Sequence, residues 1–284
     1  MDNDSLKVVG LCKSYRNFNL NNISLNIPQG AIMGFVGPNG AGKTTTLKSI
    51  LGMIKPDTGA ISFWGDINPG ETHEALGIVP DYTLYEEEWT VDIVNRVVRP
   101  FYRNWKQDVF DKLLKNYNID KNKRVKELSR GMNVKLMLAV ALSHDAKLLV
   151  LDEPTSGLDP VARDELCELL SEYVSDGEKS ILFSTHITTD LDKIASHITF
   201  ILDGKIVFSE EKNKVKDKYV IVRGDEHIFT SSHKKIFVKH RVIKGLLEGV
   251  ICTENVPDMP KELSLVSPTL DELVVFISRR DSYA

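Results

Sequence analysis

The chain has 284 residues, 42% of them hydrophobic, which is enough to bury the core of one large domain and a small appendage. Its formal net charge of -4 excludes the strongly basic composition of nucleic-acid-binding proteins, so we expect no nucleic-acid partner. No stretch approaches the roughly 20 apolar residues that cross a bilayer, and the first residues carry acids without an apolar run, so neither a spanning helix nor a signal peptide is expected.

The first part of the chain leads from strands into a glycine-rich loop. Lys7–Leu11 and Ile23–Ile27 partly alternate apolar and polar side chains, which predicts strands, and Ala31–Val36 is apolar enough for a buried strand. Glycines and a proline then break the pattern in Gly37–Thr44, and a helix is expected over Thr45–Leu51. Strand, glycine-rich loop and helix is the order that a phosphate-binding loop requires.

The middle of the chain, Val91–His144, is predicted to be helical. Apolar residues fall on one helical face within Trp105–Tyr117, and Ser129–Leu142 is a second helix with Ser129 as its N-cap. Strands and helices alternate after this region, which indicates a parallel sheet with packed helices. We expect strands at Ala60–Phe63, Leu148–Leu151, Ser180–Ser184, Ile198–Leu202 and Ile206–Phe208, and helices at Val161–Val174 and Thr189–Ala195.

The pattern changes after Lys212. The lysines of Lys212–Lys218 alternate with valine and aspartate, which predicts a solvated linker. Short strands are expected at Tyr219–Val222 and Lys235–Val238, and a final helix at Thr269–Arg279. We therefore expect an α/β domain over residues 1–212, with a helical subdomain at about residues 91–144, and a small C-terminal α+β extension over residues 213–284.

A phosphate-binding motif follows the third predicted strand and fits the pattern G-x-x-x-x-G-K-[ST] in full. Its glycines let successive backbone N–H groups face one phosphate chain at a helix N-terminus. Lys43 is expected to reach the β- and γ-phosphates, and the Thr44 hydroxyl to ligate Mg²⁺. The alternative is a chance glycine-rich turn. The expected nucleotide-binding residues are Gly37, Pro38, Asn39, Gly40, Ala41, Gly42, Lys43, Thr44 and Thr45.

Two carboxylates end the apolar strand Leu148–Leu151. A strand that is apolar throughout is typical of one buried on both faces. Asp152 is expected to hold Mg²⁺, and Glu153, one residue further along, to act as the general base that polarises the attacking water. An exposed acidic turn after a core strand is the alternative, and the pairing with Lys43 and Thr44 argues against it.

Four further segments resemble the ABC (ATP-binding cassette) ATPases. The segment Leu128-Ser129-Arg130-Gly131-Met132, at a helix start, resembles the LSGGQ signature of this family. Pro154–Pro160 resembles the D-loop, His186 in Ser184-Thr185-His186 matches the switch histidine, and Tyr15 is placed where the family has an aromatic that stacks on adenine. The resemblance runs in unbroken order from about Leu6 to Glu211.

The resemblance implies a P-loop ABC ATPase cassette, with a mixed core sheet and an N-terminal antiparallel β part, that uses ATP and Mg²⁺. In this family two cassettes pair head to tail, so Ser129 and the Gly131 N–H of one subunit would contact the γ-phosphate held by the other. His186 would hold Glu153 and the water, and Asp159 would line the dimer seam. The second ATP-binding subunit would form either a homodimer or a heterodimer.

The sequence departs from the family pattern at two places. Arg130 and Met132 replace the commoner Gly and Gln of the signature, while the serine and glycine that contact phosphate are kept. Asp81 stands where the family has a glutamine that touches Mg²⁺ and faces the membrane partner. Because an acidic residue also ligates Mg²⁺, Asp81 is expected to join Thr44 and Asp152 in the metal site.

The resemblance favours the motor subunit of a transporter, in the manner of bacterial exporters of drugs, antibiotics or peptides. A separate transmembrane permease would be its partner, at the cytoplasmic face of the cell membrane. The alternative is a soluble ABC ATPase with an assembly or regulatory role. A transport subunit needs an exposed apolar groove within Pro80–Arg103 to receive the permease, and Tyr82, Leu84, Tyr85, Val94 and Val98 are the candidates to line it.

Some residues carry weaker signals. The segment Ser267–Leu273 resembles one that ends many bacterial export-type ATPase subunits, and a simple capping helix explains it equally well. His73, His144 and His197 have no acidic or histidine partners at metal-ligand spacing, and Trp64 and Trp105 lie in apolar patterns. We expect surface or loop positions for His73, His144 and His197, and core positions for Trp64 and Trp105.

Overall fold

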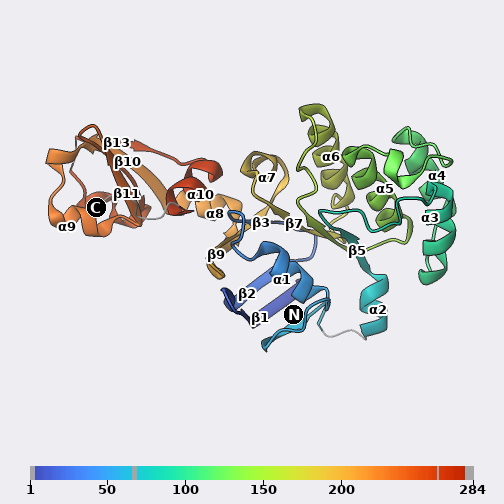
Figure 1. The fold of residues 1–284 in the computed structure, drawn as a ribbon. Coiled ribbons are helices and arrows are strands. Elements are labelled where there is room, and N and C mark those ends of the chain that lie inside the picture. The colour runs from blue at the N-terminus through green and yellow to red at the C-terminus, as the bar shows by residue number, and fades with distance from the viewer. Residues whose placement is uncertain (1–3, 66–68, 261, 279–284) are drawn as a thin grey trace.

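The computed structural model describes residues 4–65, 69–260 and 262–278, which fold around three sheets (Figure 1). The largest sheet has the strand order β5-β6-β7-β3-β8-β9. Its first five strands run parallel, and β9 pairs with β8 as an antiparallel hairpin at the edge. The strands are β3 (Ile32–Val36), β5 (Leu76–Val79), β6 (Leu148–Asp152), β7 (Ser180–Thr185), β8 (His197–Leu202) and β9 (Lys205–Glu211).

A second sheet, antiparallel with the order β2-β1-β4, packs over helix α1. Alternate residues of a strand face opposite sides of its sheet. Accordingly, Met33 and Phe35 of β3 pack with Leu47 of α1 and with β1 and β2, whereas Ile32 and Val36 pack on the other face. The large sheet is therefore buried on both faces. The elements are β1 (Asp4–Tyr15), β2 (Phe18–Pro28), β4 (Thr58–Ser62) and α1 (Lys43–Ile50).

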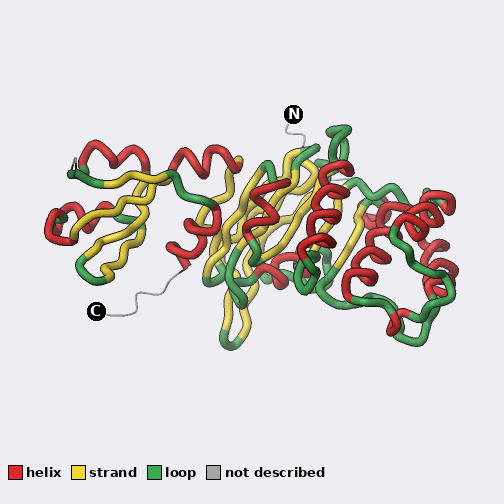
Figure 2. Tube along the Cα trace, turned by 90° about the horizontal axis from the view of Figure 1, so that it is seen from above, coloured by secondary structure: helices red, strands yellow, loops and turns green. Residues whose placement is uncertain are grey.

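Helices cover the opposite face of the large sheet and extend beyond one end of it (Figures 1 and 2). Helices α5, α6 and α7 contribute Leu138, Leu166 and Leu191 to the core on this face. Helices α3 and α4 pack on α5 in a separate cluster around Phe110. The helices are α2 (Pro69–Glu74), α3 (Val91–Val98), α4 (Gln107–Asn116), α5 (Arg130–Ser143), α6 (Pro160–Tyr173) and α7 (Thr188–Ile194).

The C-terminal part lies at the other end of the large sheet (Figures 1 and 2). It contains a four-stranded antiparallel sheet of order β11-β12-β10-β13, with α10 against one face and a small cluster around Phe229 and Phe237 against the other. The elements are α8 (Lys212–Lys218), β10 (Tyr219–Asp225), α9 (Ser231–Ile236), β11 (Lys239–Ile243), β12 (Leu246–Cys252), β13 (Ser264–Val266) and α10 (Leu270–Ser278).

The structure confirms the expected fold class, with its mixed core sheet, N-terminal antiparallel sheet and helical part. Two local predictions in the C-terminal part were wrong. Lys212–Lys218 is a helix and not a solvated linker, because Val215 is buried beneath its lysines. The strand predicted at Lys235–Val238 is the end of α9 followed by a connection, and the pairing strand begins at Lys239. Position 279 of the predicted final helix lies outside the described residues.

The hydrophobic core crosses the predicted boundary at residue 212. Ile221 and Val250 of the C-terminal sheet belong to the same buried cluster as Leu191 and Phe200, and α10 joins them. Truncation near residue 212 would expose this cluster. The division into a domain over residues 1–212 and an extension over residues 213–284 stays a prediction. The hydrophobic core is continuous across this boundary.

His144 is not a surface residue as expected. It is only 3% exposed, its ring stacks on Tyr102 with centroids 3.8 Å apart, and Nδ1 donates to the Glu74 carbonyl oxygen over 3.1 Å. Burial lowers the pKa of His144 to about 4. The tryptophans Trp64 and Trp105 are half-buried at the margins of two cores. No helix in the described part of the chain is both long and apolar enough to cross a membrane.

Candidate functional site

The phosphate loop connects β3 to α1, and two of its glycines have no room for a side chain. A Cβ atom at Gly37 would lie 2.4 Å from the Ile201 carbonyl oxygen. Gly42 has a φ of +113°, and its Cβ would lie 2.6 Å from Leu20 Cδ2 and 2.8 Å from Phe18 Cζ. The loop is thus pressed against β8 and the β1–β2 hairpin, which fixes its path into the N-terminus of α1.

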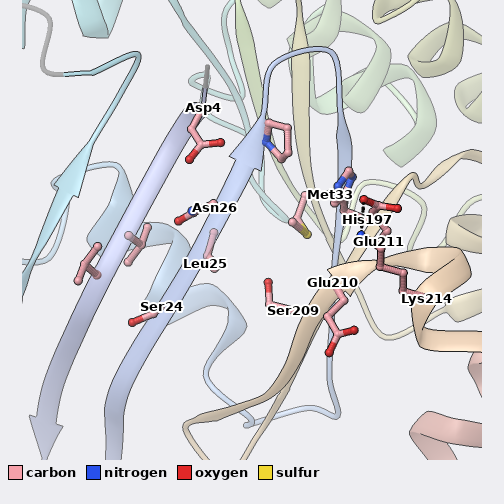
Figure 3. A pocket seen from close by; sticks show the side chains of 13 residues that line it. Asp4, Ser24, Leu25, Asn26, Met33, His197, Ser209, Glu210, Glu211 and Lys214 are labelled. Atoms are coloured by element: carbon pink, nitrogen blue, oxygen red, sulfur yellow. Dashed lines mark hydrogen bonds and ion pairs between the residues drawn. The ribbon is translucent and has the colours of Figure 1, made fainter. Parts of the chain in front are cut away.

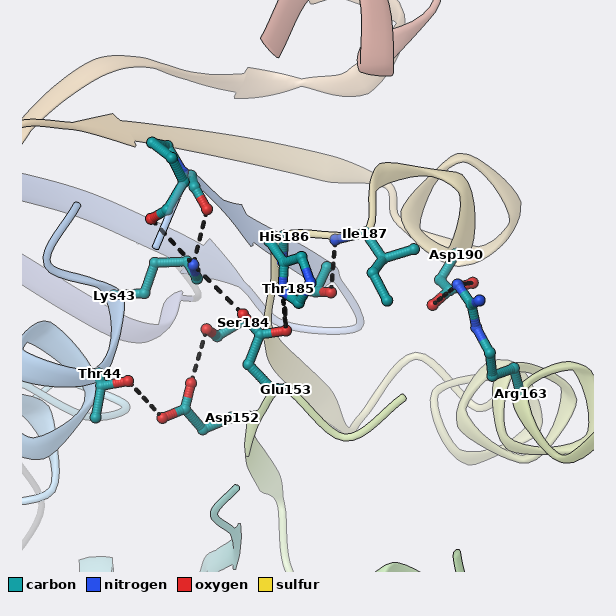
Figure 4. A network of polar contacts seen from close by, with 12 residues as sticks. Lys43, Thr44, Asp152, Glu153, Arg163, Ser184, Thr185, His186, Ile187 and Asp190 are labelled. Carbon is teal, nitrogen blue, oxygen red and sulfur yellow. Dashed lines mark hydrogen bonds and ion pairs between the residues drawn. The ribbon is translucent and has the colours of Figure 1, made fainter. Parts of the chain in front are cut away.

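Lys43 is the cation of this loop. It is only 6% exposed, and its Nζ donates to the Gly37 carbonyl oxygen over 2.7 Å. The same nitrogen lies 3.3 Å from Glu153 Oε1 (Figure 4). A buried ammonium requires such partners because its desolvation is costly. Phosphate oxygens would compete with these oxygens for the same three N–H donors.

Asp152 ends β6 and is held by two hydroxyl groups. Thr44 Oγ1 donates to its Oδ2 over 2.8 Å, and Ser184 Oγ donates to its Oδ1 over 2.9 Å (Figure 4). Burial raises the pKa of Asp152, the two hydroxyls oppose this rise, and the charges of Asp81 and Glu153 add to it. A hydroxyl and a carboxylate this close are a hard-oxygen donor set that fits Mg²⁺.

Glu153 and His186 form the second polar pair of the site. Glu153 has a φ of +50°, in the left-handed region that non-glycine residues rarely adopt. Glu153 Oε2 lies 2.8 Å from His186 Nδ1, while Oε1 faces Lys43 (Figure 4). His186 is half-exposed, so the pair faces solvent at the edge where β6 and β7 end.

The signature segment begins α5. Ser129 is the N-cap and accepts from the Met132 N–H over 3.2 Å. Arg130 packs over Gly157, and a Cβ at Gly131 would lie 3.2 Å from Leu158, so the signature abuts the D-loop of its own chain. Within residues 4–65, 69–260 and 262–278, no hydrogen bond or ion pair joins Ser129 or Gly131 to the phosphate loop.

The remaining expected residues lie around this centre. Tyr15 is 44% exposed at the end of β1, opposite Phe18, which borders Gly42. Asp81 is exposed after β5 and acts on Asp152 through its charge. Asp159 caps α6 by accepting from the N–H groups of residues 161 and 162, which gives it a local structural role.

Sequence reasoning missed two polar partners near the site. Ser184 was noted only as part of the histidine motif, yet it bonds directly to Asp152. Its position at the end of a predicted parallel strand, beside the acidic strand end, was the available signal. The second is the pair of Arg163 with Asp190, in which one guanidinium nitrogen, Nη2, donates to both carboxylate oxygens over 2.9 and 3.0 Å; it joins α6 to α7 and had no local signal.

A separate hollow of about 640 Å³ lies between β2 and β9 (Figure 3). Its lining mixes polar and apolar side chains, and two of its acids are paired: Glu210 with Lys218, and Glu211 with Lys214. None of the expected nucleotide-binding or metal-binding residues lines it. The hollow is therefore distinct from the phosphate-loop centre.

Comparison with known proteins agrees with this geometry. Residues 20–156 match the family model described as ABC transporter. The chain is 36% identical over 210 residues to the lantibiotic transport ATP-binding protein SrtF of Streptococcus pyogenes, covering 72% of this chain and 90% of that protein. It is 32% identical to the Nod factor export ATP-binding protein I of Burkholderia lata, over 84% and 82% of the two chains.

A third relative, the bacitracin transport ATP-binding protein BcrA of Bacillus licheniformis, is 31% identical over 71% of this chain and 68% of that one. Among solved structures, the ATP-binding subunit of an ABC transporter superimposes with a TM-score of 0.68 at 26% identity, covering 74% of this chain and 91% of the other. The chain therefore belongs to the ABC transporter family of ATP-binding subunits, which hydrolyse ATP to power transport.

Proposed function

We propose that the chain binds and hydrolyses MgATP in a head-to-tail dimer and so powers a membrane exporter. The observation that carries this proposal is the convergence of Lys43, Thr44, Asp152, Glu153 and His186 at one edge of the large sheet. The named relatives handle lantibiotics, Nod factors and bacitracin, which supports export of a drug, antibiotic or peptide by this chain as well. All three are transport or export subunits, so the relatives do not favour the soluble, non-transporting alternative.

In this proposal the residues have the following roles. Lys43 and the backbone N–H groups of the loop bind the β- and γ-phosphates, and Tyr15 stacks on the base. Glu153 accepts the proton of the attacking water, and His186 holds Glu153 in place. Thr44 and Asp152 hold Mg²⁺, with Asp81 beside them. Bound there, Mg²⁺ neutralises charge on the phosphate oxygens.

The position of the signature supports the dimer. Ser129 and Arg130 are exposed at the N-terminus of α5, where N–H groups favour an anion. Among the described residues, no hydrogen bond joins them to the phosphate loop of the same chain. A second cassette turned head to tail would bring its signature onto this nucleotide. Complete sites then form only in pairs.

An apolar groove supports docking of a separate permease at the cytoplasmic face of the membrane. A cavity of about 190 Å³ lies between β5 and helices α3 and α5 and includes Leu84, Tyr85 and Val98 in its lining, with Tyr102 and His144. Two expected lining residues are elsewhere: Val94 is fully buried in the helical core, and Tyr82 lines a different cleft beside Lys48. Leu84 is 44% exposed and Phe101 75% exposed. An apolar helix fits this surface.

Substitution of Leu84 by arginine tests the groove. We expect the variant to lose co-sedimentation with membranes of the source cell, because a guanidinium would be desolvated in the groove. Its ATP affinity should be unchanged, because Leu84 is not part of the phosphate loop. Val207→Arg, at a half-exposed apolar position on β9, is the matched control and should still sediment. Equal binding of Leu84→Arg and the control, or equal binding to liposomes of the extracted lipids, would argue against docking on a permease.

Asp81 gives a second test, of the metal site. Aspartate is shorter than glutamine and carries a charge that attracts Mg²⁺ and repels phosphate, so we expect it to approach the metal through water. Asp81→Gln should keep hydrolysis within about tenfold, roughly 1.4 kcal/mol of barrier. Asp81→Ala should raise the Mg²⁺ concentration needed for half-maximal ATP binding, measured by calorimetry, more than it changes ATP affinity without metal. An alanine variant identical to wild type in both would remove Asp81 from the site.

A further inference from the structure

Helix α7 starts immediately after the proposed catalytic histidine. Strand β7 ends at Thr185, and α7 begins at Thr188, two residues after His186. Thr188 is only 2% exposed, and its Oγ1 donates to Asp271 Oδ1 over 2.8 Å. Asp271 lies in the first turn of α10, 83 residues away, in the C-terminal part. One hydrogen bond therefore links that part to the segment that carries His186.

Helix α7 depends on its neighbours for its position. It is seven residues long, and its N-cap, Ile187, makes no side-chain capping bond. A helix this short has little stability of its own. Its apolar side, Leu191, packs in the same cluster as Leu270 and Leu273 of α10, both buried. The Thr188–Asp271 hydrogen bond and this apolar packing together fix the start of α7 against the first turn of α10.

Charged residues of α6 and α8 bind the middle of α7, whereas its first residue, Thr188, is bound by Asp271. Asp190 is bound by Arg163 of α6. Asp192 pairs with Lys216 over 2.9 Å, and its carbonyl oxygen accepts from Lys212, both lysines being on α8. These contacts fix the middle of the helix. At Thr188, the contact that reaches α10 is the hydroxyl–carboxylate bond.

The geometry points to Asp271 as a positioning residue for hydrolysis, acting through Thr188 on His186. This inference rests on the roles proposed for Glu153 and His186. Thr188 is two residues from His186, and two residues span at most about 7 Å of chain. A displacement of Thr188 would therefore also displace His186 and change its 2.8 Å contact with Glu153. Misplacement of a catalytic group by about 1 Å can cost up to about 10²-fold in rate. The C-terminal part therefore affects kcat for ATP hydrolysis and does not affect nucleotide binding.

Paired substitutions of the full-length chain test this inference. We expect Asp271→Ala and Thr188→Val each to lower kcat for ATP hydrolysis about fivefold, with KM for ATP unchanged, since neither residue contacts the phosphate loop. Asp271→Asn keeps the acceptor oxygen, and Thr188→Ser keeps the hydroxyl, so both should restore kcat. The double variant Thr188→Val/Asp271→Ala should be no slower than either single variant, because the two residues form one contact.

Glu272→Gln is the matched control on α10. Glu272 caps the helix by accepting from the Thr269 N–H, its other carboxylate oxygen lies 3.7 Å from Arg223 Nη2, and no hydrogen bond or ion pair joins it to α7 in the described structure. Glutamine keeps this capping pattern while removing a charge, so kcat should be unchanged. His186→Ala is measured in parallel, together with the thermal unfolding midpoint of each protein.

The outcomes separate the inference from the function on which it rests. If His186→Ala slows hydrolysis and Asp271→Ala does not, positioning by Asp271 is refuted and the proposed site stands. If Asp271→Ala lowers kcat but Asp271→Asn fails to restore it, or if its loss matches that of Glu272→Gln, Asp271 is only structural and the inference is overturned. If His186→Ala hydrolyses ATP at the wild-type rate, both the histidine role and the inference fall.

Discussion

Replacement of Glu153 by glutamine is expected to lower kcat for ATP hydrolysis by about 10²- to 10⁴-fold, the usual contribution of a general base. Glutamine has nearly the same shape but cannot accept the proton of the attacking water. Lys43 and the backbone N–H groups proposed to bind the phosphates are unchanged in this variant, so ATP affinity should change little. Steady-state phosphate release and calorimetric ATP binding measure the two quantities separately.

The matched control for this variant is Glu165→Gln. Glu165 is an exposed acid on α6 that pairs with Lys135 and has no contact with the phosphate loop among the described residues. Its loss should leave kcat unchanged, because exposed ion pairs contribute little. A Glu153→Gln protein that turns over at more than about a tenth of the wild-type rate would show that another group activates the water.

Replacement of Lys43 by alanine is expected to weaken ATP binding at least about 100-fold, or roughly 2.8 kcal/mol. The ammonium is buried at the start of α1 and is the cation of the phosphate loop, so charge-assisted bonds to phosphate would be lost. The variant also leaves Glu153, 15% exposed, without its lysine partner, which adds repulsion toward the γ-phosphate. Isothermal titration with ATP measures the effect.

Lys48→Ala is the control for the loss of a positive charge from α1. Lys48 lies over the Tyr82 ring, with its nitrogen 5.9 Å from the ring centroid. Its removal should keep ATP affinity within about threefold, as is usual for a partly solvated cation–π contact. If Lys43→Ala and Lys48→Ala bind ATP equally well, Lys43 does not hold the phosphates.

The sequence predicted five of the six strands of the large sheet, all except β5, and the centre of the site, because their signals are local. The phosphate motif is one unbroken segment between a strand and a helix, and Asp152 and Glu153 follow a strand that is apolar throughout. Carboxyl ends of parallel strands meet at one edge of a sheet, which brings these segments together. The contacts of Lys43 with Glu153 and of Thr44 with Asp152 follow from that topology.

The features that sequence reasoning missed depend on contacts between distant segments. Thr188 and Asp271 carry no motif that pairs them, and only the packing of α10 against α7 makes the bond. His144 has no partner at metal-ligand spacing, and its burial arises from Tyr102 and from the backbone before β5. In α8 Val215 is the single buried residue and attaches the helix to the core. One apolar residue gives no periodicity from which a helix could be predicted.

The C-terminal sheet shows the same limit. Its strand β12 was not predicted, although Val250 and Ile251 are fully buried in it. The apolar residues of β12 face two different clusters, one shared with α10 and one around Phe237, so they do not alternate with polar residues. A run that is apolar on both faces cannot be assigned from periodicity alone.

The central claim is that nucleotide joins two copies of the cassette, and light scattering of the Glu153→Gln protein tests it most directly. With MgATP we expect twice the monomer mass, because bound ATP bridges the phosphate loop of one subunit and the signature of the other and is not hydrolysed. Without nucleotide, and for Lys43→Ala at the same ATP concentration, we expect the monomer mass. A Glu153→Gln protein that binds ATP to saturation and remains monomeric would contradict the head-to-tail dimer.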